Sequence, residues 1–329
     1  MIQIETLTQL SGRRLRLWRE LLCGTGLTPD DHLDVSILLW QDEELVATGS
    51  RRDNILKCIA VSPSHQGEGL TATVLTHLRQ EAFSQGHRHL FLYTKPENRA
   101  QFQSLLFYPV AQTDTVLLLE DKRQGINAFL DALPVSDVSG SIGAVVMNCN
   151  PFTLGHRYLA ETAARECDHL YAFILSEDKS YFSTRDRMAM AEAGMAHLPN
   201  VTVLPTGPYL ISSATFPTYF LKDREAATEV QCLLDIEVFL NYFVPRFGIT
   251  RRYVGTEPLS PMTGMYNRAL KLHLPSRGIE LREIPRLELN HTPISASALR
   301  HALTTADWET AKTLVPATTL AYLEEHRPQ

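Results

Sequence analysis

The sequence lacks the features that mark secreted, membrane-bound and nucleic-acid-binding proteins. Its 329 residues include five cysteines and no Cys-x-x-Cys pair, which favours reduced thiols over disulfides or a zinc site. No apolar run approaches the length of a membrane span, and the N-terminus has no basic, apolar leader. The net charge of −6 argues against a nucleic-acid-binding surface. We therefore expect a cytoplasmic protein that binds neither membranes nor nucleic acids.

The chain has room for two domains, and its halves show different patterns. An apolar strand at 116–120 closes the first half, and the polar stretch 121–125 breaks the pattern. Expected strands of the second half cover 142–148, 169–175, 201–204, 251–255 and 280–284, with helices between and after them. This alternation is typical of a doubly wound parallel sheet. We predict an α/β protein with one domain at 1–122 and another at 123–329.

The most informative stretch is Asn148-Cys-Asn-Pro-Phe-Thr-Leu-Gly-His156, which lies between an apolar strand and a helix that opens on His156. A helix N-terminus presents unpaired N–H groups and partial positive charge, which suit phosphate oxygens. Gly155 has no Cβ, so a ligand can approach the backbone closely. His156 can donate a hydrogen bond to a phosphoryl group whose charge grows in the transition state. An ordinary strand–turn–helix unit explains the same stretch equally well.

A second segment, Thr292-Pro-Ile-Ser-Ala-Ser-Ala-Leu-Arg300, reads as the start of another helix with Ser295 near its N-cap. Two hydroxyls and one permanently charged guanidinium near a first turn fit a polyphosphate. Alone, the segment also fits a capped amphipathic helix with a surface Arg300. Its position after the first segment favours the phosphate interpretation.

Together the two segments resemble the nucleotidylyltransferase superfamily, which pairs (His/Thr)-x-Gly-His with Ile-Ser-x-(Ser/Thr)-x-x-Arg. The resemblance implies a five-stranded Rossmann-like parallel fold in which ATP is attacked at its α-phosphorus and pyrophosphate leaves. Thr153 at the first motif position excludes a two-histidine mechanism. The implied ATP-binding residues are Asn148, Asn150, Pro151, Phe152, Thr153, Gly155, His156, Gly255, Thr256, Glu257, Ile294, Ser295, Ser297 and Arg300.

A basic loop follows the second strand of this half. Lys179 can neutralise charge at the attacked α-phosphate, and Arg185 or Arg187 can hold a phosphate or a carboxylate. A solvated loop leading into a helix capped by Ser183 or Thr184 explains the same residues.

The segment 207–220 is rich in hydroxyl and aromatic side chains and poor in charge, which suits a small pocket. Its candidate substrate ligands are Ser212, Ser213 and Thr215. A plain Pro-rich connection fits the composition equally well. We identify no residues as ligands of a protein-bound metal.

The first half contains a strand at 56–61, the loop Gln66-Gly-Glu-Gly-Leu-Thr71 and a helix at 72–85. This element resembles motif A of the α+β GNAT-type N-acetyltransferases, whose backbone N–H groups bind the pyrophosphate of coenzyme A. Thr71 replaces the usual third Gly or Ala, and Gln66 replaces the more usual Arg. The stretch 102–108 resembles a later segment of the same fold.

A GNAT-like domain followed by this nucleotidylyltransferase domain resembles the citrate lyase ligase family over essentially the whole chain. The family implies an acid–thiol ligase that uses ATP, Mg²⁺ and acetate. Its acceptor is the phosphoribosyl-dephospho-coenzyme A thiol on the citrate lyase acyl carrier subunit, and its products are AMP and pyrophosphate. The resemblance makes His156 and Lys179 catalytic, assigns Arg185 to the substrate, and places Gln66, Gly67, Gly69 and Thr71 on the coenzyme-A-like arm.

Three alternatives stay open at this point. The chain could join ATP to a small phosphorylated metabolite, which would need a second phosphate site at Arg185 and Arg187. It could be an acetyl-coenzyme A-dependent acetyltransferase that needs no ATP. It could also be a non-catalytic assembly partner of the lyase.

Overall fold

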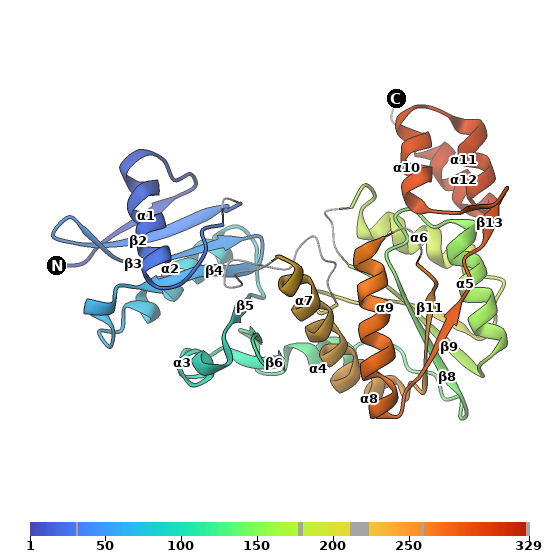
Figure 1. Cartoon of the computed structure of the whole chain (residues 1–329), viewed down its shortest axis with the longest axis horizontal. Helices are drawn as coiled ribbons and strands as arrows, with labels where there is room; N and C mark the ends of the chain where they lie inside the picture. The colour runs from blue at the N-terminus through green and yellow to red at the C-terminus, as the bar shows by residue number, and fades with distance from the viewer. Residues whose placement is uncertain (31, 177–179, 211–223, 258–259, 327–329) are drawn as a thin grey trace. The chain divides into compact units, whose positions relative to one another are not determined.

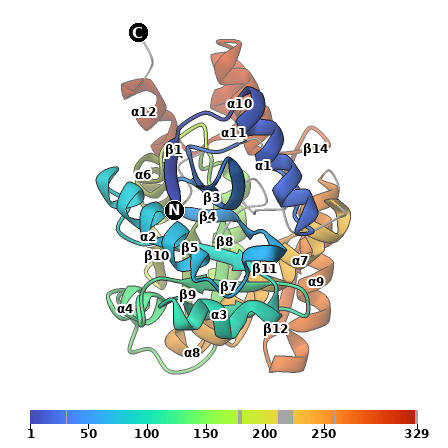
Figure 2. The same ribbon diagram turned by 90° about the vertical axis from the view of Figure 1, so that its left-hand side faces the viewer.

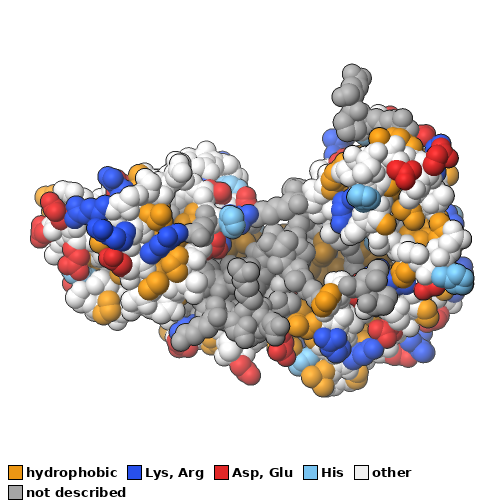
Figure 3. Space-filling view, turned by 45° about the horizontal axis from the view of Figure 1, so that its top comes forward, with side chains coloured by type: hydrophobic (Ala, Val, Ile, Leu, Met, Phe, Trp, Pro, Cys, Tyr) orange, Lys and Arg blue, Asp and Glu red, His pale blue; other side chains and the backbone are white. Residues whose placement is uncertain are grey.

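The computed structural model describes residues 1–30, 32–176, 180–210, 224–257 and 260–326 (Figure 1). The chain forms two compact units. The first unit comprises Met1–Gly125 and Phe216–Leu234, and the second comprises Ile126–Thr215 and Asp235–Gln329. The domain boundary between residues 122 and 123 stays a prediction. None of the described helices combines the length and apolarity that crossing a bilayer requires. On the face shown in Figure 3, acidic and basic side chains are interspersed on both units.

The first unit is built on a seven-stranded sheet with the order β1-β2-β3-β4-β5-β7-β6 (Figure 2). Its strands are β1 (Gln3–Leu7), β2 (Val35–Gln41), β3 (Glu44–Arg52), β4 (Ile55–Val61), β5 (Phe91–Thr94), β6 (Tyr108–Gln112) and β7 (Leu117–Glu120). Its helices include α1 (Gly12–Gly24), α2 (Leu70–Ser84) and α3 (Arg99–Ser104). Strands β2 and β3 form an antiparallel hairpin, with Asp42 and Glu43 at positive φ in its turn.

Strands β4 and β5 are the parallel pair of this sheet, and they separate after a short contact. Only Ile55 with Phe91 and Leu56 with Leu92 stand in register. Beyond them, β4 continues to Val61 while pairing with β3 on its other side. Beyond these two pairs, no registered pairing joins β4 to β5 in the described part of the chain.

The second unit contains a five-stranded parallel sheet with the order β10-β9-β8-β11-β12, which confirms the predicted doubly wound sheet. Its strands are β8 (Ile142–Met147), β9 (His169–Ile174), β10 (Val201–Pro205), β11 (Arg251–Gly255) and β12 (Glu280–Ile284). A short hairpin of β13 (Glu288–Leu289) and β14 (Thr292–Pro293) follows them. The strand order reverses between β8 and β11, and ligands bind at such a switch point beyond the carboxyl ends of the strands.

Helices surround this sheet. Those of the second unit are α4 (Gly125–Asp131), α5 (Leu154–Arg165), α6 (Thr184–Met195), α8 (Val244–Phe247), α9 (Pro261–His273), α10 (Ala296–Thr304), α11 (Trp308–Leu314) and α12 (Ala317–Glu325). Helix α7 (Arg224–Val238) is divided between the two units after Leu234. The prediction that a helix opens on His156 is wrong by two residues, because Thr153 caps it and α5 begins at Leu154. Ser183 caps α6, which confirms one of the two predicted caps.

Tight packing fixes the loop between β8 and α5. Phe152 is fully buried, and a Cβ on Gly194 of α6 would lie 2.3 Å from its ring. Only glycine at position 194 allows this close approach, because a methyl group there would displace an enclosed aromatic ring. The loop that carries Thr153 and His156 is thereby anchored to α6 from behind.

Candidate functional site

The second unit contains a cavity of about 630 Å³ at the carboxyl ends of β8, β11 and β12. Residues of both sequence motifs line it, although they are far apart in the chain. The predicted residues among its lining are Asn148, Thr153, Gly155, His156, Gly255, Glu257, Ile294, Ser295, Ser297 and Arg300. We call it the nucleotide cavity.

His156 is fixed by a reciprocal cap at the start of α5. The Thr153 backbone N–H donates to Nδ1 of His156 over 3.0 Å, and the Thr153 hydroxyl accepts from the His156 backbone N–H over 3.4 Å. Because Nδ1 accepts a hydrogen bond, the ring carries its proton on Nε2. The N–H groups of Leu154 and Gly155 at this helix start have no partner among the described residues.

The charge state of His156 follows from its surroundings. The pKa of His156 is lowered from 6.5 to about 4. The larger cause is desolvation of the ring, and the smaller one is the nearby positive charge of Arg286. The imidazole is therefore neutral at neutral pH. A neutral ring with its proton on Nε2 can donate a hydrogen bond without first acquiring charge.

The second motif is joined to the first by direct contacts. Arg300 donates to the Asn150 carbonyl over 2.5 Å and to the Ser297 hydroxyl over 3.0 Å. Ser295 caps α10 by accepting from the Ala298 N–H over 3.1 Å, as predicted. Two helix N-termini thus meet at one cavity.

Two glycines in the predicted site differ in their surroundings. A Cβ on Gly155 would lie 3.4 Å from the Ile294 carbonyl oxygen, so α5 and the segment before α10 approach closely there. A Cβ on Gly255 would meet nothing within 4 Å. Gly255 therefore leaves open space for a ligand, whereas Gly155 mainly allows the two motifs to pack.

Four predicted residues shape the site without lining the cavity, namely Asn150, Pro151, Phe152 and Thr256. The Asn150 side chain accepts from the Phe182 N–H over 3.0 Å, and the Asn150–Pro151 peptide bond is cis. Thr256 accepts hydrogen bonds from Arg286 with both its carbonyl and its hydroxyl oxygen. Their contacts are with the protein itself.

Arg187 corrects one expectation. Its side chain is fully buried and donates to the carbonyl oxygens of Asn148, Leu175 and Phe182 at 3.0, 2.6 and 3.2 Å. The prediction that Arg187 can hold a phosphate or carboxylate is wrong, because these internal acceptors occupy the guanidinium. Arg185 is exposed at the start of α6, and its role stays a prediction. Lys179, Ser212, Ser213 and Thr215 lie outside the described residues.

The sequence reading missed Arg286. It lies two residues beyond the end of β12 and lines the cavity. Its Nε donates to the Thr256 carbonyl over 2.8 Å, and its Nη2 forms an ion pair with Glu257. Glu257 also accepts from the Ser260 N–H over 3.0 Å, so this carboxylate braces the cavity wall. The dipeptide Pro285-Arg286 at a strand end was the available signal.

Charge in the nucleotide cavity is mainly positive. Its described lining contains the guanidinium groups of Arg252, Arg286 and Arg300 and one carboxylate, that of Glu257. No cluster of three His, Cys, Asp or Glu suited to a metal occurs among the described residues. Positive side chains together with two helix N-termini make this cavity complementary to a polyphosphate.

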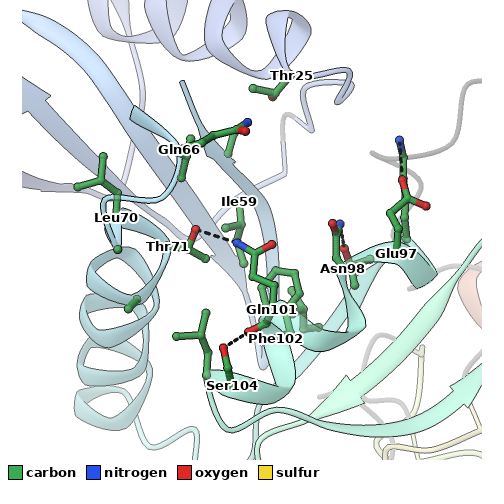
Figure 4. Close-up of a pocket in the computed structure, with 18 of the residues that line it drawn as sticks. Thr25, Ile59, Gln66, Leu70, Thr71, Glu97, Asn98, Gln101, Phe102 and Ser104 are labelled. Atoms are coloured by element: carbon green, nitrogen blue, oxygen red, sulfur yellow. Dashed lines mark hydrogen bonds and ion pairs between the residues drawn. The ribbon is translucent and has the colours of Figure 1, made fainter. Parts of the chain in front are cut away.

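A second cavity, of about 670 Å³, lies in the first unit at the gap between β4 and β5 (Figure 4). Gln66, Gly67, Gly69 and Thr71, all predicted for the coenzyme-A-like arm, line it. So do Ile59–Val61 of β4 and Leu92–Thr94 of β5. Figure 4 shows Gln101 reaching across to Thr71, with its amide 3.3 Å from the hydroxyl. We call it the arm cavity.

Both halves of the chain match known families. Residues 142–323 match the citrate lyase ligase C-terminal domain, and residues 8–103 match the acetyltransferase (GNAT) family. A Klebsiella pneumoniae [citrate [pro-3S]-lyase] ligase is 42% identical, covering 88% of this chain and 86% of the relative. Proteins of the same name from Escherichia coli and Haemophilus influenzae are 39% and 37% identical. The Escherichia coli alignment covers 94% of this chain and 91% of the relative. The Haemophilus influenzae alignment covers 95% of this chain and 96% of the relative.

Proposed function

This chain belongs to the citrate lyase ligase family, and on that premise we propose that it activates citrate lyase by acetylating a carrier thiol with acetate and ATP. The acceptor would be the phosphoribosyl-dephospho-coenzyme A group of the acyl carrier subunit. The observation that carries the proposal is the positively charged nucleotide cavity, in which the neutral ring of His156 lies at a helix N-terminus.

The nucleotide cavity offers distinct groups to the parts of ATP. The N–H groups at the starts of α5 and α10, with Ser295, Ser297 and Arg300, would hold the β- and γ-phosphates that leave as pyrophosphate. The open space over Gly255 would receive the adenosine. Mg²⁺ would neutralise phosphate charge, and it would be bound mainly by the nucleotide because Glu257 is already paired with Arg286.

The first step would form acetyl adenylate. An acetate oxygen attacks the α-phosphorus, the bond from that phosphorus to the bridging oxygen breaks, and pyrophosphate leaves. His156 donates its Nε2–H to the phosphoryl oxygen on which charge develops, and Lys179 would neutralise charge at the same phosphate. Arg185, Ser212, Ser213 and Thr215 are the residues proposed to bind acetate.

The second step would transfer the acetyl group to sulfur. The carrier thiolate attacks the acetyl carbon, and AMP leaves with the electron pair of the broken bond. The arm cavity is suited to the coenzyme-A-like arm, because β4 and β5 diverge after Leu56 and Leu92 and both line the cavity, so an extended chain with amides can lie between them. Gly69 is the N-cap residue of α2 and has no side chain to cap it, which leaves the N–H groups of Leu70 and Thr71 for phosphate oxygens.

The first test is acetate-dependent exchange of labelled pyrophosphate into ATP, without lyase. Exchange that requires acetate supports carboxylate adenylation. Addition of thiol-form citrate lyase should then move labelled acetate onto the carrier and release AMP. Absence of exchange and of transfer in protein that binds ATP, with thiol-form lyase present, would contradict the proposal.

A second candidate rests on the arm cavity and the GNAT match of residues 8–103. An acetyltransferase would move acetate from acetyl-coenzyme A to an acceptor amine or thiol without ATP. The two functions separate in one assay of labelled acetyl-coenzyme A with thiol-form lyase and no nucleotide. Carrier acetylation under those conditions favours the acetyltransferase, and strict dependence on ATP favours the ligase.

A further inference from the structure

We propose that Arg286, which neither motif contains, contacts a phosphate of the nucleotide. That phosphate would lie between the guanidinium of Arg286 and the ring of His156. The inference rests on the proposed function and adds a residue to its site. It starts from the position of Arg286, two residues beyond the carboxyl end of β12, in the lining of the nucleotide cavity.

The guanidinium of Arg286 is held in a fixed orientation. Its backbone N–H donates to the Thr256 hydroxyl over 3.1 Å, its Nε to the Thr256 carbonyl over 2.8 Å, and its Nη2 binds Glu257. These contacts use one edge of the planar group. Nη1 has no partner among the described residues, and the side chain keeps 27% of its exposure. The structure therefore presents a preorganised donor to the cavity.

The other two arginines of the cavity are placed differently. Arg300 is tied to the Asn150 carbonyl and the Ser297 hydroxyl, so it holds the two motifs together. Arg252 is only 2% exposed and stacks on Phe239, with 4.8 Å between its guanidinium carbon and the ring centroid. Arg286 combines partial exposure with a rigid anchor, and this combination suits direct contact with an incoming anion.

Arg286 also acts on His156 electrostatically. After burial, its positive charge is the second cause of the lowered pKa of the imidazole. The other ionisable groups in the described lining are Arg252, Arg300, Glu257, Tyr158, Tyr253 and Tyr266. A phosphate between the ring and Arg286 would receive a hydrogen bond from each side.

The test compares Arg286→Met with Arg286→Lys and with a control, Arg282→Met. Arg282 is an exposed arginine of β12 that lies outside the cavity lining. We expect Arg286→Met to raise the KM for ATP and to slow acetate-dependent pyrophosphate exchange about 100-fold, the scale for losing one preorganised donor. In the Arg286→Met variant the pKa of His156, measured by NMR of the ring, should rise toward 6.5. Arg286→Lys should keep that pKa low and recover part of the rate, and Arg282→Met should behave as wild type.

A folded Arg286→Met protein with exchange within threefold of wild type would overturn the inference. If Arg286→Met does not fold, Arg286→Lys decides, and full wild-type rate and KM for ATP in that variant would refute a fork-shaped phosphate contact. Failure of the proposed function gives a different result. The wild type would bind ATP without acetate-dependent exchange, and the affinities of the two Arg286 variants for ATP would still test the contact.

Discussion

The two cavities are similar in size and differ in what surrounds them. The arm cavity measures about 670 Å³ and the nucleotide cavity about 630 Å³, and each lies where a helix begins beyond a strand. In the arm cavity, α2 begins at Leu70 without a side-chain cap, and Nζ of the exposed Lys95 lies 3.8 Å from Oε1 of the exposed Glu97. In the nucleotide cavity both helices are capped and three arginines contribute positive charge.

A helix N-terminus beyond a strand can therefore serve two kinds of ligand, depending on the side chains around it. Uncapped N–H groups and two diverging strands suit a long arm that carries amides and phosphates, because the protein backbone supplies most of the contacts. A reacting triphosphate needs positive side chains at fixed positions, because charge changes during the reaction. Single side-chain deletions should therefore damage the nucleotide cavity, whereas damage to the arm cavity requires an added obstruction.

The largest effect should come from His156→Ala. Loss of one preorganised donor should lower acetate-dependent pyrophosphate exchange by about 10²–10³-fold. The exposed His301 of α10 provides the control, because His301→Ala leaves the cavity lining intact. Near-normal exchange in folded His156→Ala protein would contradict the claim that the nucleotide cavity depends on single side chains.

Removal of Arg187 tests the wall of the nucleotide cavity. Arg187→Met should leave buried carbonyls without a donor and lower the free energy of unfolding by about 3 kcal/mol. Urea unfolding of Arg187→Met and of Arg185→Met measures the contrast, and the exposed Arg185 should change stability by less than about 0.5 kcal/mol. Equal stabilities would mean that the buried contacts contribute nothing net.

Obstruction of the arm cavity should separate the two steps. Thr71→Trp places a large ring beside Gln101 at the start of α2. We expect unchanged pyrophosphate exchange and acetyl transfer to the carrier slowed by about 10²-fold, the scale for misplacing a reacting group. The exposed Thr76 of the same helix gives the control Thr76→Trp. Loss of exchange together with transfer would show that the cavities do not act independently.

The smallest effect concerns pH. Because the pKa of His156 is about 4 in the folded protein and 6.5 for a solvent-exposed histidine, the neutral ring contributes fully to stability above pH 6.5. That contribution falls as the pH decreases from 6.5 to 4, by about 2 kcal/mol at pH 5. Urea unfolding at pH 7.5 and pH 5 should show this loss in wild type relative to His156→Gln. A constant difference between the two proteins would contradict the depressed pKa.

Much of the second unit could be predicted because its signals are local. Apolar runs bounded by Gly, Pro and Asn mark the strands, and Thr153, Ser183 and Ser295 are residue types that cap helices. The two motifs flank strands whose carboxyl ends share one edge of a parallel sheet. Their meeting at one cavity therefore follows from the predicted topology.

Side-chain direction was the part that the sequence did not contain. Arg187 lies in α6 and Arg286 lies beyond β12, and both are arginines in polar sequence surroundings, yet Arg187 is fully buried and Arg286 lines the cavity. Their tertiary partners decide this outcome, and those partners come from other segments of the chain. Strand β1 was not identified either, because its residues are largely exposed and show no apolar alternation.

The cap formed by Thr153 and His156 has a consequence for the history of the family. The imidazole that we place at the α-phosphate also completes a helix cap, and caps contribute about 1 kcal/mol to stability. In a marginally stable protein, selection for folding alone would preserve this histidine after activity had been lost. An inactive descendant would therefore keep its Thr-x-x-His pair, and the pair alone would not distinguish it from a working enzyme.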